Sequence, residues 1–206
     1  MTIRRILKPL VVLFLALCFF SAAKAQEWPA TTPVWAAKSN LLYDVTTTMN
    51  LGVEFKIAEK WTLDVPISYN PWTFSHNKKW KHILVQPESR WWACEAFSGH
   101  FFGVHAHYAF YNVGNVNIGL KFPFGVNLNN LKDYRYQGWL LGAGISYGYH
   151  WVLAPRWSLE ASVGAGYAYL DYDRYECAKC GDKVGSQTKH YLGPTKAAIS
   201  LIYIIK

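Results

Sequence analysis

The sequence is poor in charged residues and lacks an apolar run long enough to cross a membrane as a helix. Charged residues make up 17% of the 206-residue chain, against about 25% in soluble domains. The apolar stretch 10–20 is too short for a helical span, which needs roughly 20 residues, and no later segment is longer. The sequence therefore predicts no helical membrane anchor, and its low charge is unusual for a soluble domain.

Motifs that carry known chemistry are also missing. The sequence contains no phosphate-binding glycine loop and no H-E-x-x-H zinc motif, and its G-x-S-x-G match at 144–148 lies inside the alternating segment 138–151, not at a strand-to-helix elbow. Its scattered Ser, His and Asp residues do not establish a catalytic triad without geometry. We therefore expect no cofactor and identify no catalytic residue.

The N-terminus has the features of a secretory signal peptide. Arg4, Arg5 and Lys8 precede the apolar run, and the small residues of Ala23-Lys24-Ala25 follow it. We expect a signal peptide at 1–25, a short periplasmic segment at 26–33 and one domain at 34–206. Removing four basic residues lowers the net charge from +8 to +4, that is 17 basic minus 13 acidic, which does not indicate nucleic-acid binding.

The chain is instead rich in aromatic residues, at 17%, and contains segments in which apolar residues alternate strictly with small or polar ones. Over residues 157–169, odd positions are Trp, Leu, Ala, Val or Tyr, and even positions are Ser, Glu, Gly or Ala. A period of two over 13 residues gives a strand one apolar side and one small or polar side. Ordinary strands have about 5–6 residues, whereas a tilted membrane-spanning strand needs roughly 9–11. Aromatic residues also stand at both ends of the apolar side, as in interfacial belts.

Similar alternation predicts eight strands, at 34–44, 50–57, 61–70, 82–93, 99–111, 138–151, 157–169 and 195–205. Short turns at 58–60, 94–98 and 152–156 alternate with longer connections at 44–49, 71–81, 112–137 and 171–194. Outer-membrane barrels have short periplasmic turns and longer external loops. We predict an all-β fold, an eight-stranded antiparallel transmembrane β-barrel of up-and-down meander topology, in the outer membrane. The rival fold is a soluble β-sandwich or lipocalin-like barrel.

The polar sides of these strands would project into the lumen of the barrel. An eight-stranded barrel has room for side chains but hardly for a channel, and enclosed charges must pair. We expect an ion-pair network there, with a proton path or ligand pocket as the alternative. Its predicted members are Lys38, Glu54, Lys56, Asp64, Glu88, Arg90, His105, His107, His150 and Glu160.

Three smaller features allow more than one interpretation. Cys177 and Cys180 fit a disulfide within an external loop, a zinc half-site with His190 nearby, or a redox motif. Cys94 falls at a turn on the opposite side and is predicted to be free or intermolecular. His105 and His107 could supply two metal ligands, although no further ligand is evident and we predict no metal site. The basic, Trp-containing loop 77–82 fits either contact with lipid A or simple solvation.

Several segments resemble a family of small outer-membrane β-barrel proteins of Gram-negative gut-type bacteria, built on a domain of unknown function. They are Lys38-Ser39-Asn40-Leu41-Leu42-Tyr43-Asp44, Asn70-Pro71-Trp72-Thr73-Phe74, Lys132-Asp133-Tyr134-Arg135-Tyr136-Gln137-Gly138-Trp139, Cys177-Ala178-Lys179-Cys180-Gly181 and Gly193-Pro194-Thr195-Lys196. The resemblance implies a barrel without established catalytic residues, whose gene often lies near genes for fimbria-type surface assembly. The C-terminal Tyr203-Ile204-Ile205-Lys206 departs from outer-membrane barrels, which usually end on an aromatic residue.

Two classes of function follow. The first is a non-enzymatic surface barrel with a structural, adhesion or fimbria-accessory role through its external loops. The alternative is a small outer-membrane enzyme that modifies lipid A or phospholipid, which needs an acid–base group at the lipid interface. We favour the first, because the histidines are expected to project into the lumen. Expected partners are outer-membrane lipid and lipid A, the barrel-assembly machinery and surface fimbrial components, with no nucleic acid.

Overall fold

A computed structural model describes residues 34–116, 121–122, 126–127, 134–176 and 181–205. The predicted signal peptide, the predicted segment 26–33 and the cysteines at 177 and 180 lie outside these described residues. Among the described residues, no helix is long and apolar enough to cross a membrane.

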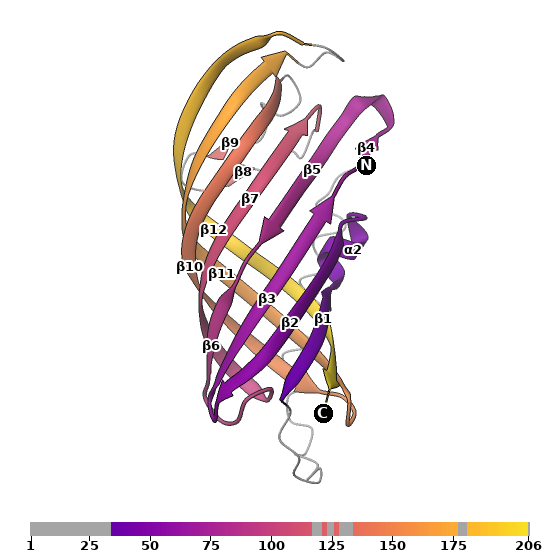
Figure 1. Ribbon diagram of the computed structural model, residues 1–206, viewed down its shortest axis with the longest axis vertical. Coiled ribbons are helices and arrows are strands. Elements are labelled where there is room, and N and C mark those ends of the chain that lie inside the picture. Colours follow the sequence, from indigo (N-terminus) through magenta and orange to yellow (C-terminus); the bar gives the residue numbers. More distant parts are fainter. Residues whose placement is uncertain (1–33, 117–120, 123–125, 128–133, 177–180, 206) are drawn as a thin grey trace. The chain divides into compact units, whose positions relative to one another are not determined.

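The described chain is almost entirely antiparallel β-sheet (Figure 1). Its elements are β1 (Trp35–Asn40), α2 (Leu41–Val45), β2 (Met49–Ala58), β3 (Trp61–Asn70), β4 (Thr73–Phe74), η2 (Ser75–Asn77), β5 (Lys78–Val85), β6 (Glu88–Trp92), β7 (Gly99–Gly114), β8 (Lys121–Phe122), β9 (Val126–Asn127), β10 (Tyr134–Val152), β11 (Trp157–Glu176) and β12 (Lys183–Ile205). β8 and β9 form a separate two-stranded sheet.

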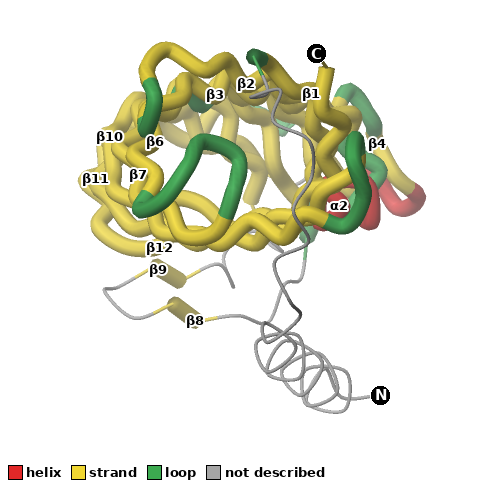
Figure 2. The backbone as a smooth tube through the Cα atoms, turned by 90° about the horizontal axis from the view of Figure 1, so that it is seen from below, coloured by secondary structure: helices red, strands yellow, loops and turns green. Residues whose placement is uncertain are grey.

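The main sheet closes on itself into a ring. β1 pairs with β2 on one side and with β12 on the other, and β10 pairs with both β7 and β11. β5 and β6 share one position, because each pairs with β3 and with β7. The ring therefore has eight strand positions joined in an up-and-down meander, and Figure 2 shows it along its axis. We call the end with the β2–β3, β6–β7 and β10–β11 turns the lower end, as in Figure 1.

The first predicted strand is wrong after residue 40. The chain turns into the short helix α2 there, because the Asn40 side chain accepts a hydrogen bond from the Leu42 amide at 3.1 Å and caps the helix. The Asn50 side chain accepts from the Asn40 amide at 2.5 Å and donates to its carbonyl at 3.2 Å, in place of a neighbouring strand. Leu41 and Tyr43 thus belong to a helix at the upper end and not to a strand.

The predicted strand 82–93 is also wrong as one continuous strand. It is interrupted at Gln86-Pro87 and starts earlier, at Lys78. Proline has no N–H to donate to a ladder, so pairing stops beside it. The interruption divides the strand into β5 above and β6 below, while the same sides continue to face in and out.

The last three strands extend beyond their predicted ends, to residues 134, 176 and 183. Segments expected to be loops, 171–176 and 183–194, are therefore mostly paired as a β-hairpin that projects at the upper end (Figure 1). Apolar and polar residues alternate less clearly in these segments, which contain Asp173 and Lys183. Sequence periodicity therefore does not reveal this extension.

Burial alternates along the ring strands as their sequence does. On β7, odd positions from 101 to 109 are buried inside and even positions from 102 to 110 are exposed outside. The polar, small and charged residues lie inside, whereas Val104, Ile145 and Val163 are 57–69% exposed on the outside. The ring therefore has a polar interior and an apolar exterior.

β10 and β11 approach each other closely at Gly144 and Gly166, which are paired across the two strands. A Cβ on Gly166 would lie 2.5 Å from the Gly144 Cα and still closer to the Ala143 carbonyl oxygen, and both are backbone atoms. Gly185 on β12 is the matched control, since nothing lies within 4 Å of a Cβ there.

We predict that Gly166→Ala lowers the free energy of unfolding by about 1–3 kcal/mol, because the strands must move apart. Gly185→Ala should leave it unchanged. Urea titration followed by circular dichroism measures both, and equal midpoints for the two variants would contradict the close packing of β10 on β11.

Candidate functional site

The lower half of the interior holds a network of buried charges centred on Arg90. Its guanidinium contacts Glu54 at 2.9 Å, Asp64 at 2.6 Å, Glu88 at 2.9 Å and Glu160 at 2.9 Å. Arg90 is 1% exposed, and the four carboxylates are equally buried. A guanidinium has five N–H donors in a rigid plane, so one side chain can serve several carboxylates.

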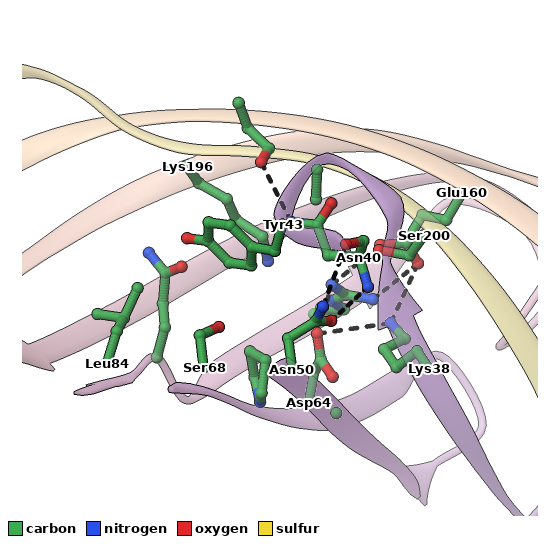
Figure 3. Close-up of a pocket in the computed structure, with 16 residues that line it drawn as sticks. Lys38, Asn40, Tyr43, Asn50, Asp64, Ser68, Leu84, Glu160, Lys196 and Ser200 are labelled. Carbon is green, nitrogen blue, oxygen red and sulfur yellow. Dashed lines mark hydrogen bonds and ion pairs between the residues drawn. The ribbon is translucent and has the colours of Figure 1, made fainter. Parts of the chain in front are cut away.

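Lys38 on β1 is the second cation of the network. Its ammonium lies 2.5 Å from Glu54, 3.2 Å from Glu160 and 3.5 Å from Asp64. Glu54 comes from β2, Asp64 from β3 and Glu160 from β11. Lys38 therefore connects strands on different sides of the ring across its interior (Figure 3), as Arg90 does through Asp64 and Glu160.

Lys196 on β12 is the third cation and contacts the Glu88 carboxylate. The same carboxylate accepts a hydrogen bond from the Ser146 hydroxyl. Thr62 donates to Glu54 at 2.5 Å, and the Trp92 indole donates to Thr62 at 2.9 Å. These hydroxyls satisfy carboxylate oxygens that the cations do not reach.

The network contains three permanent cations and four carboxylates. His150 Nδ1 lies 3.8 Å from the Glu160 carboxylate and is 2% exposed. His150 therefore lies at the edge of the network, beside Glu160.

An apolar cluster lies beside the network toward the lower end of the ring. The Trp92 ring packs on Phe101 at 4.9 Å and on Phe97 at 6.0 Å between centroids. Phe97 belongs to the β6–β7 turn, is 2% exposed and has a φ of 66°. This turn therefore folds inward and covers the interior at its lower end.

A small cavity of about 40 Å³ lies on the upper side of the network. Tyr43 from α2, Asn50, Ser68, Gln86 and Ser200 line it together with the charged residues (Figure 3). A water needs roughly 10–15 Å³, so the cavity has room for a few waters. The Asp64 oxygen Oδ1 is buried without a hydrogen-bond partner in the described part of the chain and lies at this cavity.

The structure places nine of the ten predicted lumen residues in the buried interior of the ring. The exception is Lys56, which is half-buried near the lower rim, beside the bulge between Lys56 and Ala58. His105 and His107 lie above the charges, and His105 Nε2 is 2.9 Å from the Thr195 hydroxyl. Sequence reasoning left Lys196 out of the network, although its inward position follows from the alternation with Ser200.

Two histidines do not project inward as expected. His100 and His190 lie on the outer side, where their Nδ1 atoms are hydrogen-bonded to the hydroxyls of Tyr147 at 2.7 Å and Tyr167 at 2.5 Å. His100 stands on the same side of the predicted strand 99–111 as the apolar Phe102 and Val104, and His190 lies in the segment 171–194 that was predicted as a connection.

Metal and cysteine chemistry find little support in the described ranges. No cluster of three or more His, Cys, Asp or Glu residues able to hold a metal ion occurs among the described residues. Cys94 lies in the β6–β7 turn at the lower end, where it is exposed and free. The basic stretch 77–82 begins in η2 and continues into β5, so it is largely strand and not loop.

We predict that Arg90→Met destabilises the fold by about 3–5 kcal/mol, because it leaves four buried carboxylates short of a counter-charge. Arg156→Met is the matched control, since Arg156 is exposed and its guanidinium is hydrogen-bonded to the Tyr203 hydroxyl at 2.9 Å. Urea midpoints of the two purified variants measure the difference. Similar midpoints would show that the interior charges are solvated and independent of one another.

Comparison with known proteins gives one match. A family model described as a protein of unknown function (DUF3575) matches residues 10–205. No curated protein and no solved structure matches the chain.

Proposed function

The chain belongs to the DUF3575 family of proteins of unknown function, and we propose that it is a non-enzymatic β-barrel of the outer membrane. In this proposal the eight-position ring spans the bilayer, and the protein acts through its upper end in a structural, adhesion or fimbria-accessory role. The observation that carries the proposal is that the ring has polar side chains inside and apolar side chains outside, the reverse of the arrangement in a soluble protein.

The outer surface of the ring is a continuous apolar band. Val104 on β7 pairs with Ile145 on β10, and the next outward neighbour on β11 is Ala165. Large apolar side chains at these outward positions are exposed in the isolated chain. Monomeric soluble proteins rarely expose apolar patches above a few hundred Å², whereas lipid tails are a suitable medium for such a surface.

Aromatic residues border the band on both sides. Below, Trp91 packs on Phe102 at 6.2 Å and Trp157 packs on Tyr203 at 5.1 Å. Above, Trp139 packs on Tyr169 at 5.8 Å and lies near Tyr108. Interfacial girdles of this kind border the apolar band of membrane barrels.

The height of the band fits a bilayer. Trp157 and Tyr167 stand ten residues apart on the outer side of β11. At ~3.4 Å per residue and a tilt of ~40°, ten residues span roughly 26 Å. Membrane barrels have an apolar band of about 25 Å, so the strands have the length that crossing requires.

The interior supports a role other than transport or catalysis. Its charges are held by Arg90, Lys38 and Lys196, and the cavity beside them is only about 40 Å³. A group fixed in several ion pairs is poorly placed to exchange protons with a substrate, and a filled lumen does not conduct. The upper end, with α2 and the β11–β12 hairpin, therefore offers the surface for partners.

One observation supports the alternative function, an enzyme that modifies lipid A or phospholipid. His190 lies on the outer side at the upper aromatic border and is hydrogen-bonded to Tyr167. A histidine at that depth has the position that an acid–base group would need. Loss of lipid modification in cells carrying His190→Gln would favour the enzyme over the structural role.

We predict that Val163→Lys blocks insertion into lipid vesicles, because a cation in the middle of the band costs about 2–4 kcal/mol. Val184→Lys is the matched control, since Val184 is also exposed but lies near the tip of the β11–β12 hairpin. Insertion is measured by the heat-modifiable mobility of the folded protein in gel electrophoresis. Normal insertion of Val163→Lys would place this surface in water and contradict the proposal.

The proposed orientation predicts opposite labelling at the two ends of the ring. Three ring strands, β7, β10 and β11, separate the turn holding Cys94 from the tip of the β11–β12 hairpin, so the two lie on opposite sides. In a chain with Cys177→Ser and Cys180→Ser, a membrane-impermeant thiol reagent on intact cells should not label Cys94. Adding Gly185→Cys should produce labelling, and the reverse result would invert the orientation.

A further inference from the structure

The outer surface carries a groove where the apolar band meets the polar upper end. It has a volume of about 580 Å³ and crosses β3, β5, β7, β10 and β11. Its lower wall is formed by the outward side chains of Tyr69, Ile83, Phe110 and Trp139. Its upper wall is a row of polar residues paired across the sheet, Lys81, Asn112, Gln137 and Asp173.

We propose that this groove binds the sugar headgroup of a glycolipid in the outer leaflet. The inference rests on the proposed membrane-spanning function and deepens it, because it names a lipid class that the upper border of the barrel recognises. Each wall of the groove matches one part of such a molecule.

The amides of the upper wall suit hydroxyl groups. Asn112 donates to the Gln137 carbonyl oxygen at 3.2 Å. The carbonyl oxygen of Asn112 is buried and has no hydrogen-bond partner within the described part of the chain. A sugar hydroxyl is both donor and acceptor, so it can accept from the Gln137 amide and, once the Asn112 side chain turns toward the groove, donate to this oxygen.

The charges of the upper wall are balanced, which favours a neutral headgroup. The Asp173 carboxylate pairs with Lys183 at 2.8 Å and accepts from the Ser186 hydroxyl at 2.7 Å. These bonds, with that from Lys183 the larger cause, hold the pKa of Asp173 below its usual value, so it is ionised at neutral pH. Of the described Lys and Arg residues, Lys81 alone lines the groove. A phosphate group would need a cluster of cations and would be repelled by Asp173.

The lower wall suits the rest of the molecule. The Trp139 and Phe110 rings present flat apolar surfaces to the C–H face of a sugar, as aromatic side chains at membrane borders do for headgroups. Below them the outward residue Leu141 continues the apolar band toward the middle of the bilayer. A glycolipid could therefore place its sugar in the groove and its acyl chains along β7 and β10.

The test uses the full protein in nanodiscs of phosphatidylcholine that contain a few per cent of a glucosyl diacylglycerol. Lipids retained by the protein are counted by native mass spectrometry, and phosphatidylglycerol at the same level serves as the anionic comparison. We expect the glucosyl lipid to be enriched severalfold over its bulk fraction and the anionic lipid not to be. Gln137→Leu should abolish the enrichment.

Gln187→Leu is the matched control, because Gln187 is an exposed β12 residue bonded to Tyr172 and lies outside the groove. It should retain the glucosyl lipid as the unaltered protein does. Enrichment of phosphatidylglycerol instead, or equal loss in both variants, would overturn the sugar site. Folded, heat-modifiable protein without any enrichment would overturn it while leaving the membrane-spanning function intact, and failure to enter nanodiscs would overturn both.

Discussion

The structure depends on the compensation of charges that the ring encloses. Arg90 contacts carboxylates from β2, β3, its own strand β6 and β11, and Lys38 joins three of the same carboxylates from β1. Lys196 adds β12 through Glu88. Buried ions are tolerated only where geometry and additional hydrogen bonds satisfy them. The ring must therefore close in this register, because a one-residue slip in any of these strands would turn a charge to the apolar side.

That network also explains why the outside can be apolar. A soluble ring of this size would place its large side chains inside and its charges in water. Here the interior holds small residues, paired charges and, at its lower end, the aromatic side chains of Trp92 and Phe101, whereas large apolar side chains such as Val104 and Ile145 stand outside, 63% and 69% exposed. The same alternation thus determines a filled interior and an apolar outer surface, which the proposed function places in lipid. The polar ends of the strands, with α2 and the β11–β12 hairpin, are left to meet water and partners.

The sequence predicted those parts of the fold that depend on strict alternation. The strand 61–70 and the inward position of Glu160 follow from a period of two, which is insensitive to distant contacts. Periodicity could not predict that Asn40 would cap a helix. The hydrogen bond from the Leu42 amide to the Asn40 side chain competes with continued strand pairing, and the alternation of the sequence is compatible with both. It also missed the upper extension of β11 and β12, since strands exposed to water on both sides need no alternation.

The sequence predicted which residues form the candidate site better than it predicted which of them contact one another. Alternation alone indicates that Lys38, Asp64 and Arg90 face inward, but only the ring closure shows that one guanidinium reaches four carboxylates. Lys196 is separated by 108 residues from its partner Glu88, and no local sequence pattern indicates such a pair. The outer groove was unpredictable for the same reason, because Lys81, Asn112, Gln137 and Asp173 become neighbours only through the pairing of four strands.

The central claim is that the outer side of the ring lies in lipid, and depth-resolved spin labelling on β10 tests it most directly. In a chain freed of its native cysteines, a spin label is placed singly at the outward positions 139, 141, 143, 145 and 147 of protein in lipid vesicles. Collisions with oxygen should be most frequent near position 143, and collisions with a water-soluble nickel chelate should be least frequent there. High and uniform access of the nickel chelate at all five positions would contradict the account.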